Sequence, residues 1–163
     1  MPNILGIDPG GKTGIAMLRE KGTVTFNDLE YVEIEGGYSG FVNWWEDNWK
    51  WLGFDVHGEW DIIVERFELR KQDFVADITP KEIIGMLKYW ARIHDRELFW
   101  AMAGAHKGLV TDEALKRAGL YPPRGQVKGG HSTDGMRLCA YHRIKNLRDR
   151  EFAARLFPKS NNN

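Results

Sequence analysis

The fold is decided by the stretch Asn3-Ile4-Leu5-Gly6-Ile7-Asp8-Pro9-Gly10-Gly11-Lys12-Thr13-Gly14-Ile15-Ala16-Met17-Leu18. It opens with a short apolar run that ends in a carboxylate, Asp8, and a second apolar run returns from Thr13 to Leu18. Pro9-Gly10-Gly11 lies between the two runs. Proline presets one backbone dihedral and glycine accepts positive φ, so a tight turn is expected there. The stretch therefore predicts a β-hairpin of buried strands with one acidic side chain at a strand end.

The carboxylate of Asp8 has two interpretations at this point. A buried carboxylate is costly unless it is paired or binds a metal, which favours a functional group at the strand end. The alternative is that Asp8 accepts hydrogen bonds from the backbone of its own turn, as aspartates in Asx-turns do. The hairpin alone leaves both interpretations open.

Length and composition indicate a single domain. The chain has 163 residues, enough for one hydrophobic core, and we expect the domain to span residues 1–157 with a disordered tail at 158–163. There is no apolar run of about 18 residues or more and no secretory signal pattern, so we expect no membrane partner. Cys139 is the only cysteine, which excludes an intramolecular disulfide and fits a reducing cytoplasm.

Charge is balanced over the whole chain, with 23 basic and 23 acidic side chains, but it is unevenly distributed. Residues 1–60 carry 4 Lys or Arg and 10 Asp or Glu, whereas residues 105–163 carry 12 and 5. This asymmetry indicates a basic face for phosphate groups. The alternative is that the two ends of the chain pair with each other across the fold, and charge alone leaves that open.

A second strand that ends in a carboxylate is predicted at Asp61-Ile62-Ile63-Val64-Glu65. Its three β-branched aliphatic residues are typical of a buried, parallel central strand. Glu65 then stands at the end of this strand as Asp8 stands at the end of the first. The sequence thus offers two strand-end carboxylates.

Periodicity and capping residues predict the remaining elements. Ser39 is the expected N-cap of an aromatic-rich helix, Thr79 that of a second helix and Thr111 that of a third, which Gly119 ends. The tryptophans of the first helix cannot all face one core, so most are expected to pack and some to be exposed. We expect further strands over 23–35 and 97–103, and helices over 38–52, 79–95, 112–118 and 130–144.

The last predicted helix begins with two groups of interest, His131 and Asp134. Their i, i+3 spacing brings both side chains to one helical face. Asp134 in the first turn also complements the helix dipole, and His131 is also compatible with a plain loop residue. These simpler interpretations weaken once Asp8 and Glu65 already supply two carboxylates.

The order of these features resembles that of RuvC-type Holliday junction resolvases, which belong to the RNase H-like nucleases. That family opens with an apolar run followed by G-I-D-P-G and T-G, matched here by Gly6-Ile7-Asp8-Pro9-Gly10 and Thr13-Gly14. Its second carboxylate ends the fourth strand, as Glu65 does, and the form H-x-x-D on its last helix matches His131 and Asp134. Actin-like ATPases share a similar hairpin, but they need two such lobes and hence a longer chain.

The chain departs from the family pattern at two places. Phe67 follows the glutamate by two residues, whereas the family has its phenylalanine one position later, and Glu68 is open as a further ligand or a surface residue. Gly135 replaces the alanine that usually follows the last aspartate, and we expect it to loosen the helix locally.

The resemblance implies an α/β RNase H-like fold, a mixed five-stranded sheet with helices on both faces. It also implies a Mg²⁺-dependent endonuclease, with Mn²⁺ as a substitute, that cuts branched DNA in a bacterial or phage-infected cell. Two ions would lie ~4 Å apart and clamp the attacking and leaving oxygens. Asp8 would bridge them, Glu65 and Asp134 would each hold one, and His131 would be a ligand or a proton donor. A resolvase cuts two strands, so a homodimer is expected.

The basic C-terminal third supplies the expected phosphate contacts, which are Lys107, Arg124, Lys128 and Arg137. Two rival functions stay open. One is a nuclease of the same fold that acts on RNA or flap DNA. The other is a nucleic-acid-binding domain without catalysis, which the complete acidic set disfavours.

Overall fold

The protein is described by a computed structural model over residues 1–19, 29–67, 77–122 and 130–158. Its elements in chain order are β1 (Asn3–Asp8), β2 (Thr13–Leu18), β3 (Leu29–Ile34), α1 (Gly37–Asn48), β4 (Trp60–Glu65), α2 (Thr79–Ile93), β5 (Leu98–Ala101), α3 (Ala105–Leu109), α4 (Asp112–Arg117), α5 (His131–Lys145) and α6 (Arg150–Leu156). None of the helices in the described segments combines the length and apolar character needed to cross a bilayer.

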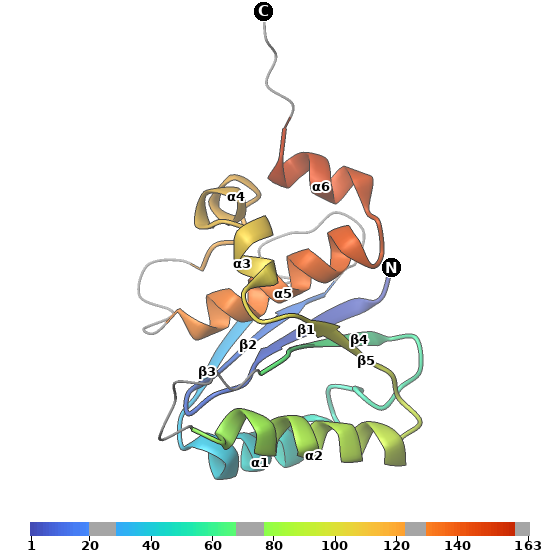
Figure 1. The fold of residues 1–163 in the computed structure, drawn as a ribbon. Coiled ribbons are helices and arrows are strands. Elements are labelled where there is room, and N and C mark those ends of the chain that lie inside the picture. Colours follow the sequence, from blue (N-terminus) through green and yellow to red (C-terminus); the bar gives the residue numbers. More distant parts are fainter. Residues whose placement is uncertain (20–28, 68–76, 123–129, 159–163) are drawn as a thin grey trace, which may run out of the picture.

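The strands form one mixed sheet in the order β3-β2-β1-β4-β5. The pairs β1–β2 and β2–β3 are antiparallel, whereas β4 is parallel to β1 and β5 is parallel to β4. Helices α1 and α2 cover one face and α5 lies across the other, with α3, α4 and α6 on the same side as α5 (Figure 1). The predicted five-stranded α/β architecture with helices on both faces is confirmed.

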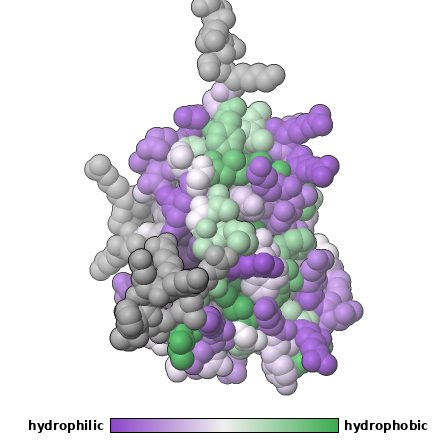
Figure 2. Space-filling view, viewed as in Figure 1, coloured by the Kyte–Doolittle hydropathy of each residue, from purple (hydrophilic) through white to green (hydrophobic). Residues whose placement is uncertain are grey.

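Side chains alternate between the two faces of the sheet and divide the core into two parts. Facing α5 are the strand residues Ile4, Ala16, Leu18, Ile63 and Ala101, and facing α1 and α2 are Leu5, Ile7, Ile15, Met17, Ile62 and Val64. Asp8 and Glu65 are in step with Ile4 and Ile63, so both carboxylates are directed to the α5 side. Figure 2, which looks at the edge of the sheet as Figure 1 does, shows a mixed surface, with hydrophobic side chains along its middle and hydrophilic ones at its margins.

Glycines allow α5 to lie unusually close to the hairpin. A Cβ atom added to Gly6 would overlap the carbonyl oxygen of Gly135, and one added to Gly14 would overlap the carbonyl of His131. A Cβ at Gly135 would lie 2.8 Å from the backbone nitrogen of Ala16. The prediction that Gly135 loosens the helix is therefore wrong, because α5 runs unbroken through it and the missing side chain is what lets helix and sheet touch.

Helix α1 begins earlier and ends earlier than the sequence predicts. Its N-cap is Gly36, not Ser39, because Gly36 and Gly37 have positive φ values of 87° and 59° and turn the chain into the helix there. The helix ends at Asn48, and turns follow it before β4. Of the tryptophans in this region, Trp45 is buried and Trp51 is 70% exposed, as expected for residues that cannot share one core.

The other predicted elements are confirmed with small shifts in their ends. Helix α2 begins at Thr79 itself, so its N-cap is Ile78 and not the predicted Thr79. The Asp77 carboxylate accepts a hydrogen bond at the start of the helix, from the Thr79 N–H at 3.0 Å. Thr111 caps α4 through the N–H of Ala114, as predicted. No sequence pattern predicted the short helices α3 and α6. The first part of the predicted strand 23–35 lies outside the described residues, as do residues 159–163 of the tail.

We predict that Gly14→Ala lowers the free energy of unfolding by about 3 kcal/mol, because a methyl group there meets the backbone of α5, which cannot rotate away. Urea unfolding followed by circular dichroism measures the change. Gly85→Ala is the matched control, since Gly85 lies within α2 with no heavy atom near its Cβ position. The control should raise stability by about 0.5–1 kcal/mol through helix propensity. A Gly14→Ala protein as stable as the wild type would contradict the close packing.

Candidate active site

Asp8 and Glu65 meet at one edge of the sheet. They end the parallel neighbours β1 and β4, whose register pairs Ile7 with Val64. Because parallel strands carry their carboxyl ends to the same edge, the two carboxylates become neighbours on the α5 side. Their side chains are only 13% and 14% exposed. The structure thus brings the two strand-end carboxylates side by side.

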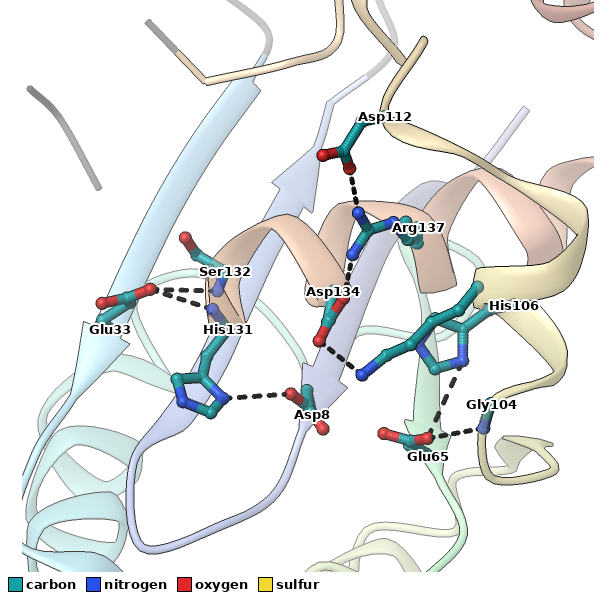
Figure 3. A network of polar contacts seen from close by, with 11 residues as sticks. Asp8, Glu33, Glu65, Gly104, His106, Asp112, His131, Ser132, Asp134 and Arg137 are labelled. Atoms are coloured by element: carbon teal, nitrogen blue, oxygen red, sulfur yellow. Dashed lines mark hydrogen bonds and ion pairs between the residues drawn. The ribbon is translucent and has the colours of Figure 1, made fainter. Parts of the chain in front are cut away.

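The start of α5 brings His131 and Asp134 to the same edge. Gly130 caps the helix with a φ of 80°, and the Glu33 carboxylate of β3 accepts hydrogen bonds from the backbone N–H groups of His131 and Ser132 at 3.0 and 3.5 Å. Glu33 thereby fixes the first turn of the helix over the sheet. The His131 Nδ1 atom lies 3.4 Å from Asp8 Oδ2 (Figure 3).

Asp134 is compensated by two cations. The Lys107 ammonium of α3 lies 2.7 Å from its Oδ2, and the Arg137 guanidinium donates to its Oδ1 from the next turn of α5. Arg137 also reaches Asp112 at the start of α4, so one guanidinium joins two helices. Lys107 and Arg137, predicted as phosphate contacts, thus lie at the acidic edge as counter-charges of Asp134. Arg124 and Lys128 fall outside the described residues, as does Glu68.

Helix α3 holds the other carboxylate in place. The N–H of Gly104 donates to Glu65 Oε1 at 2.9 Å, and the Nδ1 atom of His106 lies 3.9 Å from the same oxygen. The His106 ring is completely buried, and neither of its nitrogens has a hydrogen-bond partner among the described residues. Burial lowers the pKa of His106, although the charges of Glu65 and Asp134 oppose this effect. The ring thus directs a nitrogen without a hydrogen-bond partner toward Glu65.

The crowding of acidic groups acts most strongly on Asp8. Burial, then a hydrogen bond and the charge of Glu65, then the charge of Asp134, raise the pKa of Asp8 to about 9, while Lys107 acts in the opposite sense. The pKa of Lys107 is raised in turn: burial alone would lower it, but the hydrogen bond and charge of Asp134 prevail. Without an added cation, the negative charge of the site is therefore reduced by a proton on Asp8 and by the Lys107 ammonium beside Asp134.

The donor set fits a hard divalent cation, although the side chains are not gathered around one point. Among the described residues, no three His, Cys, Asp or Glu side chains stand together as ligands of one ion, because Asp134 is turned to Lys107 and Glu65 to Gly104. Three carboxylates nevertheless converge, and the unpaired nitrogens of His106 lie beside them. Mg²⁺ prefers such oxygen donors, and its charge would replace the proton on Asp8.

A pocket of about 460 Å³ opens next to the acidic edge. Its wall is formed by α3, α4 and the start of α5, with Lys107, His131, Asp134 and Arg137 among the lining residues. The pocket lets solvent and a ligand reach the carboxylate of Asp134 from the α5 side. All four sequence-predicted site residues and both described phosphate contacts therefore border the acidic edge or this pocket.

Sequence reasoning missed two functional residues, Glu33 and His106. Glu33 shares a strand face with Tyr31, two residues earlier, so the only available signal was its acidic character on the face directed to α5. His106 lies on a helix too short to show periodicity, directly before Lys107. Neither role follows from local pattern, because each depends on a contact with an element far away in the sequence.

The fold is similar to that of solved RuvC structures. RuvC of T. thermophilus in complex with a Holliday junction substrate aligns with a TM-score of 0.60 at 15% sequence identity, covering 88% of this chain and 96% of that one. A second Thermus thermophilus RuvC structure aligns with a TM-score of 0.56 at 15% identity, covering 87% and 96%. No protein-family model matches the chain, and no curated protein matches it. At this identity the likeness establishes the RuvC-like, RNase H-like α/β fold alone.

We predict that the metal-free protein becomes less stable as the pH rises from about 4 to about 9. The pKa of Asp8 is raised from 3.8 to about 9 by folding, so between these values the folded chain binds the extra proton and loses that advantage as the pH rises. Asp8→Asn removes this dependence and should raise the melting temperature at pH 8 by at least about 3 °C. Thermal melts in EDTA at pH 5 and pH 8 measure the effect.

Asp47→Asn is the control for that experiment, since Asp47 is an exposed carboxylate on α1. It should leave the pH dependence of the melting temperature as it is in the wild type. An Asp8→Asn protein that melts below the wild type at pH 8 would contradict the crowding of carboxylates at this edge.

Proposed function

We propose that the protein is a divalent-metal-dependent endonuclease that cuts branched DNA, with four-way junctions as its preferred substrate. The observation that carries the proposal is the convergence of Asp8, Glu65 and Asp134, with His131 beside Asp8, at one edge of the sheet. A fold like that of a RuvC bound to a Holliday junction supports the choice of substrate.

In this proposal Asp8, Glu65 and Asp134 hold Mg²⁺, or Mn²⁺ in its place. The bound ions would supply Lewis-acid stabilisation of the phosphate and an activated water. Asp8, on which both Glu65 and Asp134 act, would hold the cation as a carboxylate without its proton. Asp134 would serve as a ligand in place of its contact with Lys107. The Lys107 ammonium is then available to the phosphate group of the substrate.

His131 and Glu33 orient the groups around Asp8. The Glu33 carboxylate accepts a hydrogen bond from the backbone N–H of His131 and so fixes the backbone position from which the imidazole side chain extends. The ring nitrogen of His131 that lies 3.4 Å from Asp8 is within reach of the same ligand set, and the ring is 42% exposed. From this position His131 serves either as a further ligand or as a proton donor to the leaving oxygen.

A second copy of the chain belongs to the proposal, because a four-way junction is resolved by two cuts related by symmetry. The candidate interfaces are the aromatic region Trp44–Trp51 and helix α2, and α2 itself carries the more exposed apolar side chains. Tyr89 and Ile93, one turn apart, are 68% and 58% exposed. Trp51, just after α1, is 70% exposed.

We predict that Asp8→Asn abolishes cleavage while DNA binding is kept or improved, because a neutral amide cannot replace the bridging carboxylate and carries no negative charge near the phosphate. The assay incubates labelled four-way junction, flap, duplex and RNA–DNA hybrid with and without Mg²⁺. Asp47→Asn, on the exposed face of α1, is the matched control and should cut like the wild type.

The same panel separates the rival functions. If flap DNA or the RNA–DNA hybrid is cut in preference to the junction, the proposed nuclease activity stands and the proposed substrate is replaced. Junction binding without any Mg²⁺-dependent cleavage would favour a binding domain without catalysis. Full activity of Asp8→Asn protein would remove the acidic edge as the site.

We predict that His131→Asp retains activity with Mg²⁺, whereas His131→Ala loses about 100-fold in rate or more. The reason is that aspartate supplies an oxygen ligand that Mg²⁺ prefers, and alanine supplies none. If His131 is the proton donor, aspartate is a poor substitute, because it is ionised at neutral pH. Rates in Mg²⁺ and Mn²⁺ distinguish the two roles. Near-wild-type rates for both variants would exclude His131 from the site.

A further inference from the structure

A second pocket, of about 480 Å³, lies on the other side of the same strand ends. It is lined by Arg66, Phe67, Ile84, Lys88 and Trp100. Trp100 is the partner of Val64 in the β4–β5 pairing, and both residues belong to the core on the α2 side. The pocket therefore opens between the edge strand β5, helix α2 and the residues that follow β4.

The pocket gathers positive charge around one aromatic ring. The Lys88 ammonium lies 5.3 Å from the centroid of the Trp100 ring, and the Arg66 guanidinium carbon lies 6.0 Å from it. Cation–π attraction of this kind holds a cation in place without neutralising it. None of the ion pairs in the described part of the chain includes Arg66 or Lys88, so both charges are available to an anion.

Arg66 connects this pocket to the acidic edge. It directly follows Glu65, and its backbone N–H donates to the carbonyl of Ala101 at 2.8 Å, which continues the β4–β5 ladder by one residue. Successive residues of a strand point to opposite faces. Glu65 is therefore directed to α5 and Arg66 to α2, and a polymer that crosses the end of β4 contacts both.

We propose that the pocket of Arg66, Lys88 and Trp100 binds a backbone phosphate of the DNA strand that runs on from the acidic edge. This assignment rests on the proposed function and extends it to a substrate contact on the α2 side of the sheet. The guanidinium and the ammonium supply the donors for the phosphate oxygens. The apolar wall of Phe67 and Ile84 is suited to the sugar or base attached to that phosphate.

The test measures DNA affinity without cleavage, in the Asp8→Asn background, by fluorescence anisotropy of a labelled four-way junction at several salt concentrations. Adding Arg66→Gln and Lys88→Gln together should weaken binding on the order of tenfold, equally for junctions of different sequence. It should also reduce the slope of log Kd against log salt by about 1, because a phosphate contact releases counterions. Lys88→Arg keeps the charge and should keep the slope.

The matched control adds Lys81→Gln and Arg92→Gln, which remove two exposed cations from the same helix, α2. If this control weakens binding as much as the pocket variant, or if the pocket variant binds with unchanged affinity and slope, the phosphate assignment is wrong while the proposed function stands. If the parent protein binds AMP saturably and the pocket variant loses this binding without a change in DNA affinity, the ligand of the pocket is a free nucleotide and not the DNA strand. A parent protein that binds no DNA at all would overturn the proposed function and this contact with it.

Discussion

The close approach of α5 to the β1–β2 hairpin is the constraint on which the site depends. Gly6, Gly14 and Gly135 leave no side chain between helix and sheet, so backbone meets backbone along the first turns of α5. His131 and Asp134 occupy those turns, and Asp8 ends the strand that they cross. A helix held one side-chain layer further out would leave these groups too far from Asp8 to act with it. The close packing at these glycines thus places His131 and Asp134 near Asp8.

This close approach has an electrostatic cost, because it brings three carboxylates beside one another at a site that is largely shielded from water. In the metal-free state, groups of the protein itself offset this negative charge. Helix α3 contributes Lys107 to Asp134 and the Gly104 N–H to Glu65, while the Asp8 pKa rises. In the proposed nuclease, a divalent cation would take the place of each of these compensations. The buried, unpaired His106 ring beside Glu65 is a further sign that the protein alone does not complete the arrangement.

The architecture could be predicted from sequence because its signals are local. The hairpin, the β-branched run that ends in Glu65 and the cap at Thr111 each lie within a few residues, and the order of strand-end acids indicated the fold. The contacts that complete the site are not local. Glu33 reaches α5 from β3, and α3 is a five-residue helix without a periodic pattern. Gly135 was misjudged for the same reason, since helix propensity describes a glycine in isolation and not one that is pressed against a sheet.

The central claim is that the acidic edge binds divalent cations, and it is tested most directly by crystals of the protein grown with Mn²⁺. Anomalous diffraction locates the ion without regard to its expected ligands. The account predicts an anomalous peak between Asp8 and Glu65 or between Asp8 and Asp134, with Lys107 moved away from Asp134. An electron-density map without a peak at this edge at millimolar Mn²⁺, in which Lys107 still contacts Asp134, would contradict it.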